Sequence, residues 1–211
     1  MPILKKENKI IYFSHVPKCG GTAIEQYCKD TGIEIAFLDK RYYLQLNKNV
    51  WNNTSPQHID NKSFDRLFPK QFFSDYFTVV RHPIDRLKSA FIYQKYHEKS
   101  IEKNKSLSDF IDNDLQVCSK KTNIYDNHFI EQHKIIINIS NSKIFKLENG
   151  LKNVKEYLDK TFFGETLSRE IKTLNKGKKL KNQNEYYLDE ATKNKIFKIY
   201  KKDFDLFDYK L

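Results

Sequence analysis

The sequence is poor in residues that interrupt or crosslink a chain. Its 211 residues include 6 Gly, 5 Pro and 3 Cys. So little Gly and Pro excludes collagen-like and proline-rich architectures. Cys19, Cys28 and Cys118 are odd in number and show no CxxC spacing. Neither a disulfide framework nor a zinc site is therefore indicated.

Long apolar runs are also missing. No stretch approaches the roughly 18 apolar residues of a membrane-spanning helix. Residues 1–9 lack the apolar core of a secretory signal peptide, and the first apolar run begins at Ile10. We expect no leader, no transmembrane segment and a cytoplasmic location. Contact with the periphery of a membrane stays open.

Positive charge is in excess. Lys and Arg number 38 against 27 Asp and Glu, which gives a net charge of +11. This balance favours anionic partners, although Lys-rich and Asn-rich usage is also typical of an AT-rich genome. The 16 Phe and 13 Tyr are too many for a disordered chain. No nucleic-acid-binding signature is present, so nucleic acid is not an expected partner.

Apolar runs and helical patterns alternate along the chain. Buried strands are predicted at 10–16, 33–38, 76–80 and 143–147. Helices are predicted at 22–30, 83–96, 127–134, 151–160 and 189–202, and 97–142 as a whole reads as mostly helical. This alternation predicts an α/β protein with a parallel sheet. No linker divides the chain, which indicates one domain over residues 1–211.

The first chemical motif follows the strand at 10–16 and reads HVPKCGGT, His15 to Thr22. A strand, a tight glycine loop and a helix start form an anion site, because backbone N–H groups converge and the helix dipole favours negative charge. Lys18 adds a mobile charge and Thr22 a hydroxyl. The motif is not a Walker A loop, in which the Lys follows the last Gly. An ordinary strand-to-helix turn with a surface Lys is the alternative.

The second motif follows the strand at 76–80 and reads RHPIDRLKS, Arg81 to Ser89. Arg81 ends a strand, which is where open α/β sheets bind ligands. Ser89 lies about two helical turns further on. Arg grips phosphate with two hydrogen bonds, and Ser adds a donor. The alternative is a structural Arg81 paired with Asp85.

Together the two motifs resemble the paired phosphate loops of the sulfotransferases that use 3′-phosphoadenosine 5′-phosphosulfate (PAPS), in particular the Golgi carbohydrate and heparan-sulfate type. The resemblance implies a three-layer sandwich with a central parallel sheet, the P-loop NTPase-like sulfotransferase fold. It also implies that the first loop binds the 5′-phosphosulfate and the second the 3′-phosphate. The implied cofactor-binding residues are Pro17, Lys18, Cys19, Gly20, Gly21, Thr22, Arg81 and Ser89.

The resemblance is strong over 10–31 and 76–96 and weaker in the C-terminal half, where NHFIEQ, KIFKLEN and IYKKDFDLFDY match the general layout. Two positions depart from it. Cys19 stands where Ser or Thr is usual, which removes a hydroxyl donor. His82 stands where Asp is common after the Arg, so its local pairing should differ.

Sulfuryl transfer to a hydroxyl needs a general base, and positioning and electrostatics should dominate the catalysis. The resemblance implies that Lys18 stabilises the leaving oxygen and that no metal takes part. His58 is the preferred base, because similar enzymes place a catalytic His between the two phosphate motifs. His15 and Glu25 remain alternatives.

The acceptor is expected to be a hydroxyl compound, most simply a glycan or glycolipid, in polysaccharide biosynthesis. A basic loop at 172–181 could close over the 3′-phosphate or guide an acidic acceptor, or be a solvated charge run. A P-loop kinase and a non-catalytic anion-binding module are the competing functions. The sequence leaves the acceptor and the oligomeric state open.

Overall fold

The computed structural model describes residues 2–39, 42, 54–172 and 186–211. Its centre is a five-stranded sheet in the order β3-β1-β2-β4-β5. The strands are β1 (Ile3–Lys6), β2 (Lys9–Ser14), β3 (Glu34–Ala36), β4 (Asp75–Val80) and β5 (Lys143–Lys146). The predicted basic loop at 172–181 lies outside the described residues, apart from Lys172.

The sheet is mixed rather than wholly parallel as predicted. β2, β4 and β5 are parallel, whereas β1 is antiparallel to both β2 and β3. β1 has only two apolar residues, Ile3 and Leu4, so it contains no apolar run from which a strand could be predicted. It forms because Glu7 takes a left-handed backbone (φ 53) that closes a tight hairpin and pairs Lys6 with Lys9.

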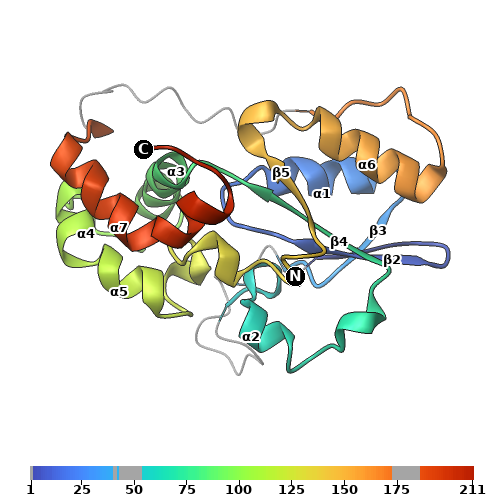
Figure 1. The fold of residues 1–211 in the computed structure, drawn as a ribbon, viewed down its shortest axis with the longest axis horizontal. Helices are drawn as coiled ribbons and strands as arrows, with labels where there is room; N and C mark the ends of the chain where they lie inside the picture. Colours follow the sequence, from blue (N-terminus) through green and yellow to red (C-terminus); the bar gives the residue numbers. More distant parts are fainter. Residues whose placement is uncertain (1, 40–41, 43–53, 173–185) are drawn as a thin grey trace.

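Helices flank the sheet, which gives the predicted α/β architecture (Figure 1). α1 (Gly21–Asp30) and α6 (Lys152–Phe163) lie on one side of it, and α2 (Asn61–Phe64) lies on the other. The remaining helices gather where β2 and β4 end, at the left of Figure 1. They are α3 (Pro83–Tyr96), α4 (Leu107–Asn113), α5 (Leu115–Lys120) and α7 (Glu190–Leu206).

The helix predicted at 127–134 is wrong. Two short 3-10 helices, η4 (Tyr125–Asn127) and η5 (Gln132–Lys134), occupy this part of the chain. Asp126 and Asn127 have φ of 50 and 59, a left-handed backbone that ends a right-handed helix. The carboxylate of Asp203 on α7 then accepts the N–H groups of Gln132 (2.7 Å) and His133 (3.1 Å), so a distant element satisfies them.

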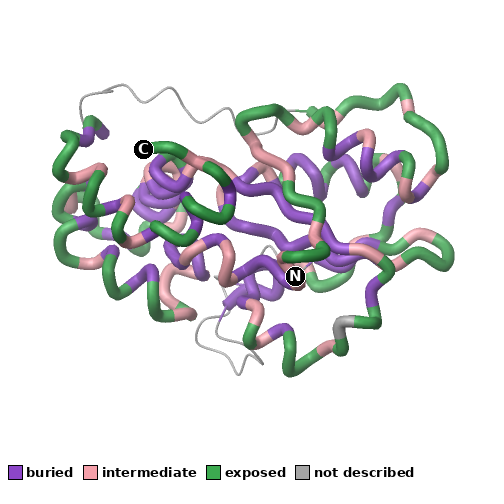
Figure 2. The backbone as a smooth tube through the Cα atoms, in the orientation of Figure 1, coloured by how far each residue is buried: buried purple, intermediate pink, exposed green. Residues whose placement is uncertain are grey.

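The strands present different side chains to the two faces of the sheet, and their central residues are buried (Figure 2). On the face under α1 and α6, the rings of Phe13 and Phe77 stack 4.6 Å apart. On the opposite face, Tyr12 packs edge-on against Phe64 and Phe73. Two packed faces hold β2 and β4 rigidly, which fixes the loops that follow them.

A buried ion pair joins α6 to its surroundings. Lys155 Nζ lies 2.9 Å from Asp159 Oδ2, which also accepts the N–H of Leu167 at 3.0 Å. Tyr27 on α1 donates its hydroxyl to the other oxygen of Asp159. Asp159 therefore connects α1, α6 and the segment after α6 at one buried point.

Asp159→Ala should lower the free energy of unfolding by about 3–5 kcal/mol, because it leaves the Lys155 ammonium buried with the Leu167 carbonyl but no carboxylate. Urea denaturation measures the change. Asp205→Ala is the matched control, since it breaks the same i,i+4 pairing with Lys201 on an exposed surface and should change stability little. Equal losses for the two variants would contradict the role of burial.

Candidate active site

The two sequence motifs come together because β2 and β4 are neighbouring parallel strands. Ser14 pairs with Thr78, whose hydroxyl donates to the Ser14 carbonyl at 2.8 Å. The loops after the two strands therefore leave the same edge of the sheet. Arg81 Nη1 reaches the carbonyl oxygen of Lys18 at 3.5 Å, so the second loop contacts the first.

The first loop has the backbone of an anion cradle. Gly20 caps α1 with φ 85, in the left-handed region that favours glycine. Gly21 begins the helix, and a Cβ there would lie 1.9 Å from His15 Nε2. Thr22 is exposed in the first turn of α1, where N–H groups have no partner within the helix. Gly20 and Gly21 therefore both require glycine. The N–H groups at the N-terminus of α1 are the donors that could bind an anion.

Cys19 points away from the cradle. Its Sγ is buried and lies 3.6 Å from both Gln132 Oε1 and the Pro17 carbonyl oxygen. Burial raises the pKa of the thiol to about 12, so it stays protonated. A role for Cys19 in anion binding is thus limited to its backbone, and its side chain fastens the loop to the core.

Gln132 connects the first loop to the second. Its side chain accepts the Arg81 N–H at 3.0 Å and donates to the Arg81 carbonyl at 2.9 Å, as a paired strand would. This holds the backbone of Arg81 at the end of β4. Ser89 lies partly exposed on α3, about two turns beyond.

His82 is tied to the end of the chain. Its N–H donates to Glu148 Oε1 at 2.7 Å, and its Nε2 lies 2.8 Å from the carbonyl oxygen of Lys210. Its ring packs edge-on against Tyr209. The imidazole thus makes partners on the C-terminal segment at the position where Asp is common in the resembled motif.

His58 is held by a carboxylate that the sequence did not reveal. Its Nδ1 lies 2.7 Å from Asp126 Oδ2 and 3.1 Å from Ser55 Oγ. Ser55 donates to Asp126 through both its N–H (2.6 Å) and its hydroxyl (2.7 Å). Asp126 thereby fixes the ring orientation and favours the tautomer with the proton on Nδ1, which leaves Nε2 as the acceptor.

Asp126 is ionised in this arrangement. Burial alone would raise the pKa of the carboxyl group. The charge of His58 and its hydrogen bond outweigh burial and lower the pKa of Asp126 to about 2. The carboxylate of Asp126 therefore stays charged beside Nδ1 of His58.

The two alternative bases are paired with each other. His15 Nδ1 lies 3.1 Å from Glu25 Oε1, and both side chains are buried. Burial lowers the pKa of His15, although the Glu25 carboxylate opposes this. His15 also touches the candidate base, with its ring 5.1 Å from that of His58. This buried pair therefore connects α1, which carries Glu25, to the ring of His58.

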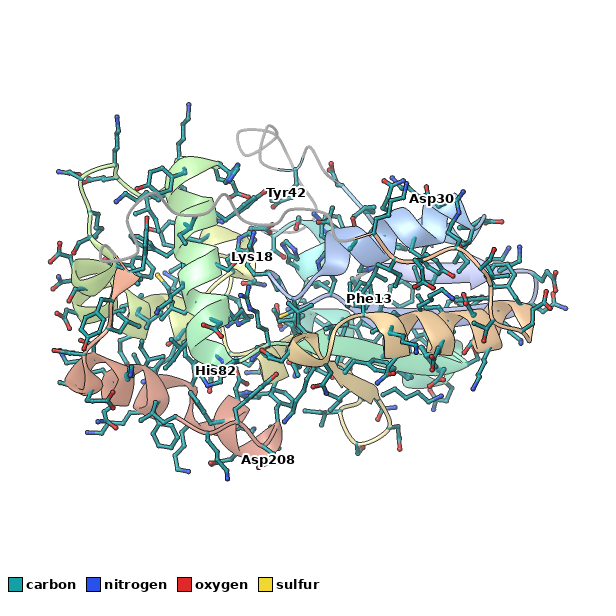
Figure 3. All side chains as sticks on the ribbon, turned by 90° about the horizontal axis from the view of Figure 1, so that it is seen from above. Phe13, Lys18, Asp30, Tyr42, His82 and Asp208 are labelled. Atoms are coloured by element: carbon teal, nitrogen blue, oxygen red, sulfur yellow. The ribbon has the colours of Figure 1, made fainter. Side chains whose placement is uncertain are left out.

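Lys18 lies beside α3 (Figure 3), where its ammonium sits 3.9 Å from the ring centre of Tyr93. The ring of Tyr93 in turn contacts that of His128, and the ring of His128 contacts that of His58. The ring centres are 5.2 and 5.1 Å apart. Burial lowers the pKa of Lys18 to about 8; Glu98 opposes this shift and Arg81 adds to it. Among the described residues no carboxylate lies within ion-pair distance of this ammonium.

Several of these residues gave no usable signal in the sequence. Asp126 and Tyr93 carry no motif of their own, and Asp126 meets His58 across 68 positions of chain. Gln132 ends the NHFIEQ segment, but nothing in that segment indicated its contact with Arg81. His128 is buried, and burial lowers its pKa well below the usual value, so it is a neutral neighbour. Within the described ranges, no group of three or more His, Cys, Asp or Glu could hold a metal ion.

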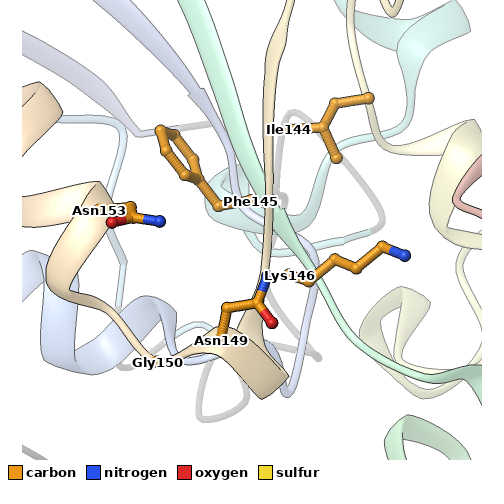
Figure 4. A pocket seen from close by; sticks show the side chains of 6 residues that line it. All are labelled: Ile144, Phe145, Lys146, Asn149, Gly150 and Asn153. Carbon is orange, nitrogen blue, oxygen red and sulfur yellow. The ribbon is translucent and has the colours of Figure 1, made fainter.

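A separate shallow pocket lies at the edge strand β5 (Figure 4). Phe145 and Asn153 lie on one side of this strand, and Ile144 and Lys146 on the other. Gly150 and Asn149 close its end. The pocket has no titratable group except Lys146, whose ammonium donates to the Asp208 carbonyl at 3.0 Å. The chemistry-bearing residues are gathered at the ends of β2 and β4 instead.

Comparison with known proteins gives one match. The model of a family described as the sulfotransferase family matches residues 2–210. No curated protein and no solved structure matches the chain. No helix among the residues that the structure describes is long and apolar enough to cross a membrane.

Gly21→Ala should destabilise the fold by about 1–3 kcal/mol, because the new methyl group would overlap His15. The same substitution in a His15→Ala background should cost little, since the ring is gone. Thermal unfolding of the four proteins in this cycle measures the difference. The same penalty in both backgrounds would show that another contact opposes the methyl group.

Proposed function

The chain belongs to the sulfotransferase family, and we propose that it transfers the sulfuryl group of PAPS to a hydroxyl of a carbohydrate acceptor. One observation carries this proposal: the His58–Asp126 pair lies next to two converging anion-binding loops. An imidazole aligned by a carboxylate is a general base, and the loops supply donors for an anionic nucleotide. The family implies sulfuryl transfer, and the paired loops support PAPS as the donor.

The residues at the loops fit this donor. The first loop offers the N-terminus of α1, two glycines and the ammonium of Lys18, which suit the 5′ end. Arg81 at the end of β4 and Ser89 on α3 suit the 3′-phosphate. When bound, PAPS supplies a sulfuryl group activated by its anhydride bond to phosphate. Lys18 and Arg81 carry the charge opposite to that of the phosphates of this donor.

The acceptor hydroxyl must lose its proton as it attacks. Nε2 of His58 accepts that proton, and Asp126 stabilises the imidazolium that results. The acceptor oxygen forms the new bond to sulfur while the bridging oxygen leaves with the bonding electrons. Lys18 is the nearby cation that neutralises the departing oxygen.

A carbohydrate acceptor is supported by the similarity of both motifs to the carbohydrate-sulfating enzymes. The direct test is transfer of labelled sulfate from PAPS to a panel of glycans, glycolipids, alcohols and phenols. Transfer to a glycan supports the proposal. Transfer to phenols alone would overturn the acceptor class, and transfer of phosphate from ATP instead would overturn the function.

Arg81→Ala should weaken binding of 3′-phosphoadenosine 5′-phosphate by about 1.5–3 kcal/mol, because a charge-assisted contact to the 3′-phosphate is lost. Binding of AMP, which lacks that phosphate, should barely change. Calorimetry with both ligands measures the two losses. Equal losses would mean that Arg81 supports the fold of the loops rather than reading the phosphate.

Lys18→Ala should lower kcat about 10²–10³-fold and affect donor binding less, because charge on the leaving oxygen develops in the transition state. With a pKa near 8, Lys18 loses its charge above that pH, so kcat/KM of the wild type should fall there. Lys18→Arg keeps its charge and should move this alkaline limb upward.

The control for Lys18→Arg is Lys152→Arg, an exposed position on α6 that should leave the pH profile unchanged. Steady-state kinetics over a range of pH measures both variants. An unchanged kcat in Lys18→Ala with only a raised KM would contradict the role of Lys18 at the leaving oxygen.

His58→Ala should lower kcat about 10²–10⁴-fold, abolish the acidic limb of the pH profile and leave nucleotide binding intact. Asp126→Asn keeps the imidazole but removes the charge beside it. Its loss of kcat should be smaller than that of His58→Ala, because the ring is still present but no carboxylate aligns it.

Rate–pH profiles of wild type and both variants provide the measurement. A wild-type kcat and profile in His58→Ala would overturn the assignment and move it to His15 or Glu25. A wild-type kcat in Asp126→Asn would show that Asp126 acts only in folding.

A further inference from the structure

Apolar side chains gather on the surface at the segments after β3 and after α2. Phe37 and Phe72 are exposed by 42% and 50%, and both rings contact that of Phe68, at 5.8 and 5.7 Å. Leu67, next to Phe68, is exposed by 46%. We call these four residues the Phe72 patch. Contiguous exposed apolar side chains on a surface indicate a candidate interaction site.

The backbone at Phe37 argues that this exposure is not incidental. Phe37 follows β3 and has φ 56, in the left-handed region. A bulky aromatic residue there is strained, and Gly or Asn would make the same turn more easily. The unfavourable backbone is kept at a residue whose ring lies on the surface against Phe68. We therefore attribute the presence of Phe at this position to its side chain and not to the turn.

Two exposed cations lie on the segment that carries most of the patch. They are Lys62 and Arg66, with Asp65 between them, and the chain as a whole carries +11. Exposed aromatic rings with neighbouring cations are the combination that binds the interface of an anionic bilayer.

The patch is fastened to the segment that carries the base. The backbone of Asp39, two residues after Phe37, exchanges two hydrogen bonds of 3.1 Å with the side chain of Gln57, the neighbour of His58. On the other side, Asp60 caps α2 by accepting from Lys62 N at 3.0 Å. A surface bound at the patch would therefore be held near His58.

We propose that the Phe72 patch docks the protein on an anionic lipid surface, where His58 meets acceptor hydroxyls displayed at headgroup level. The docking stands on the patch alone, and its link to the acceptor rests on the proposed function. Phe37 and Phe72 enter the interface, and Lys62 and Arg66 pair with lipid phosphates.

Co-sedimentation with vesicles containing about 30 mol % anionic lipid tests the docking without any nucleotide. Phe37→Asn/Phe72→Ser should reduce vesicle affinity about tenfold or more, in line with the loss of two apolar anchors. Asn suits the backbone of Phe37, so the fold is kept. The matched control is Tyr187→Asn/Leu206→Ser, an aromatic and an aliphatic residue exposed by 78% and 47% at α7 or just before it.

Salt separates the two contributions. At about 0.5 M salt, where charge interactions are screened, the patch variant should still bind less than wild type. Lys62→Glu/Arg66→Glu should lose affinity mainly at about 0.1 M salt. Equal binding of wild type and patch variant would overturn the proposal, because the overall charge of the chain would then explain sedimentation.

A second copy of the chain is the other occupant that the test resolves. Sedimentation velocity that finds a wild-type dimer, and a monomer for the patch variant, would overturn lipid docking. If only the proposed function is wrong, the result differs. The protein would then still bind vesicles through the patch but would transfer no sulfate from PAPS to any acceptor.

Discussion

The parallel pairing of β2 with β4 is the constraint on which the site depends. It brings two loops, separated by about 60 residues of chain, to one edge of the sheet. Both strands are packed on two faces by aromatic side chains, so their ends move little relative to each other. Gln132 then fixes the backbone of Arg81, and Arg81 reaches the carbonyl of Lys18. A ligand that touches both loops meets a preformed surface.

The candidate base depends on a second long-range contact. His58 belongs to a short 3-10 helix under the sheet, and Asp126 belongs to the segment between α5 and β5. Asn127 donates to the His58 carbonyl at 2.9 Å, and Arg86 donates to the His128 carbonyl at 2.9 Å. Buried hydrogen bonds to backbone therefore hold this irregular segment where a helix would not place Asp126.

The sequence predicted what local patterns encode. The strands and helices on either side of the two motifs form nearly where expected, because apolar runs and Pro83 at a helix start are local signals. The mixed sheet and the missing helix at 127–134 could not be predicted in this way. β1 depends on pairing with two other strands, and η5 depends on the Asp203 carboxylate. The same holds for Asp126 and Tyr93, whose partners are distant in the chain.

We propose that the two loops form one site for a nucleotide with phosphates at both the 5′ and 3′ positions. Calorimetry of the wild-type protein with 3′-phosphoadenosine 5′-phosphate and with ATP, each with and without Mg²⁺, tests it most directly. The bisphosphate should bind more tightly than ATP by about tenfold or more, in line with one additional charge-assisted phosphate contact, and Mg²⁺ should make no difference. Tighter binding of ATP that requires Mg²⁺ would contradict it.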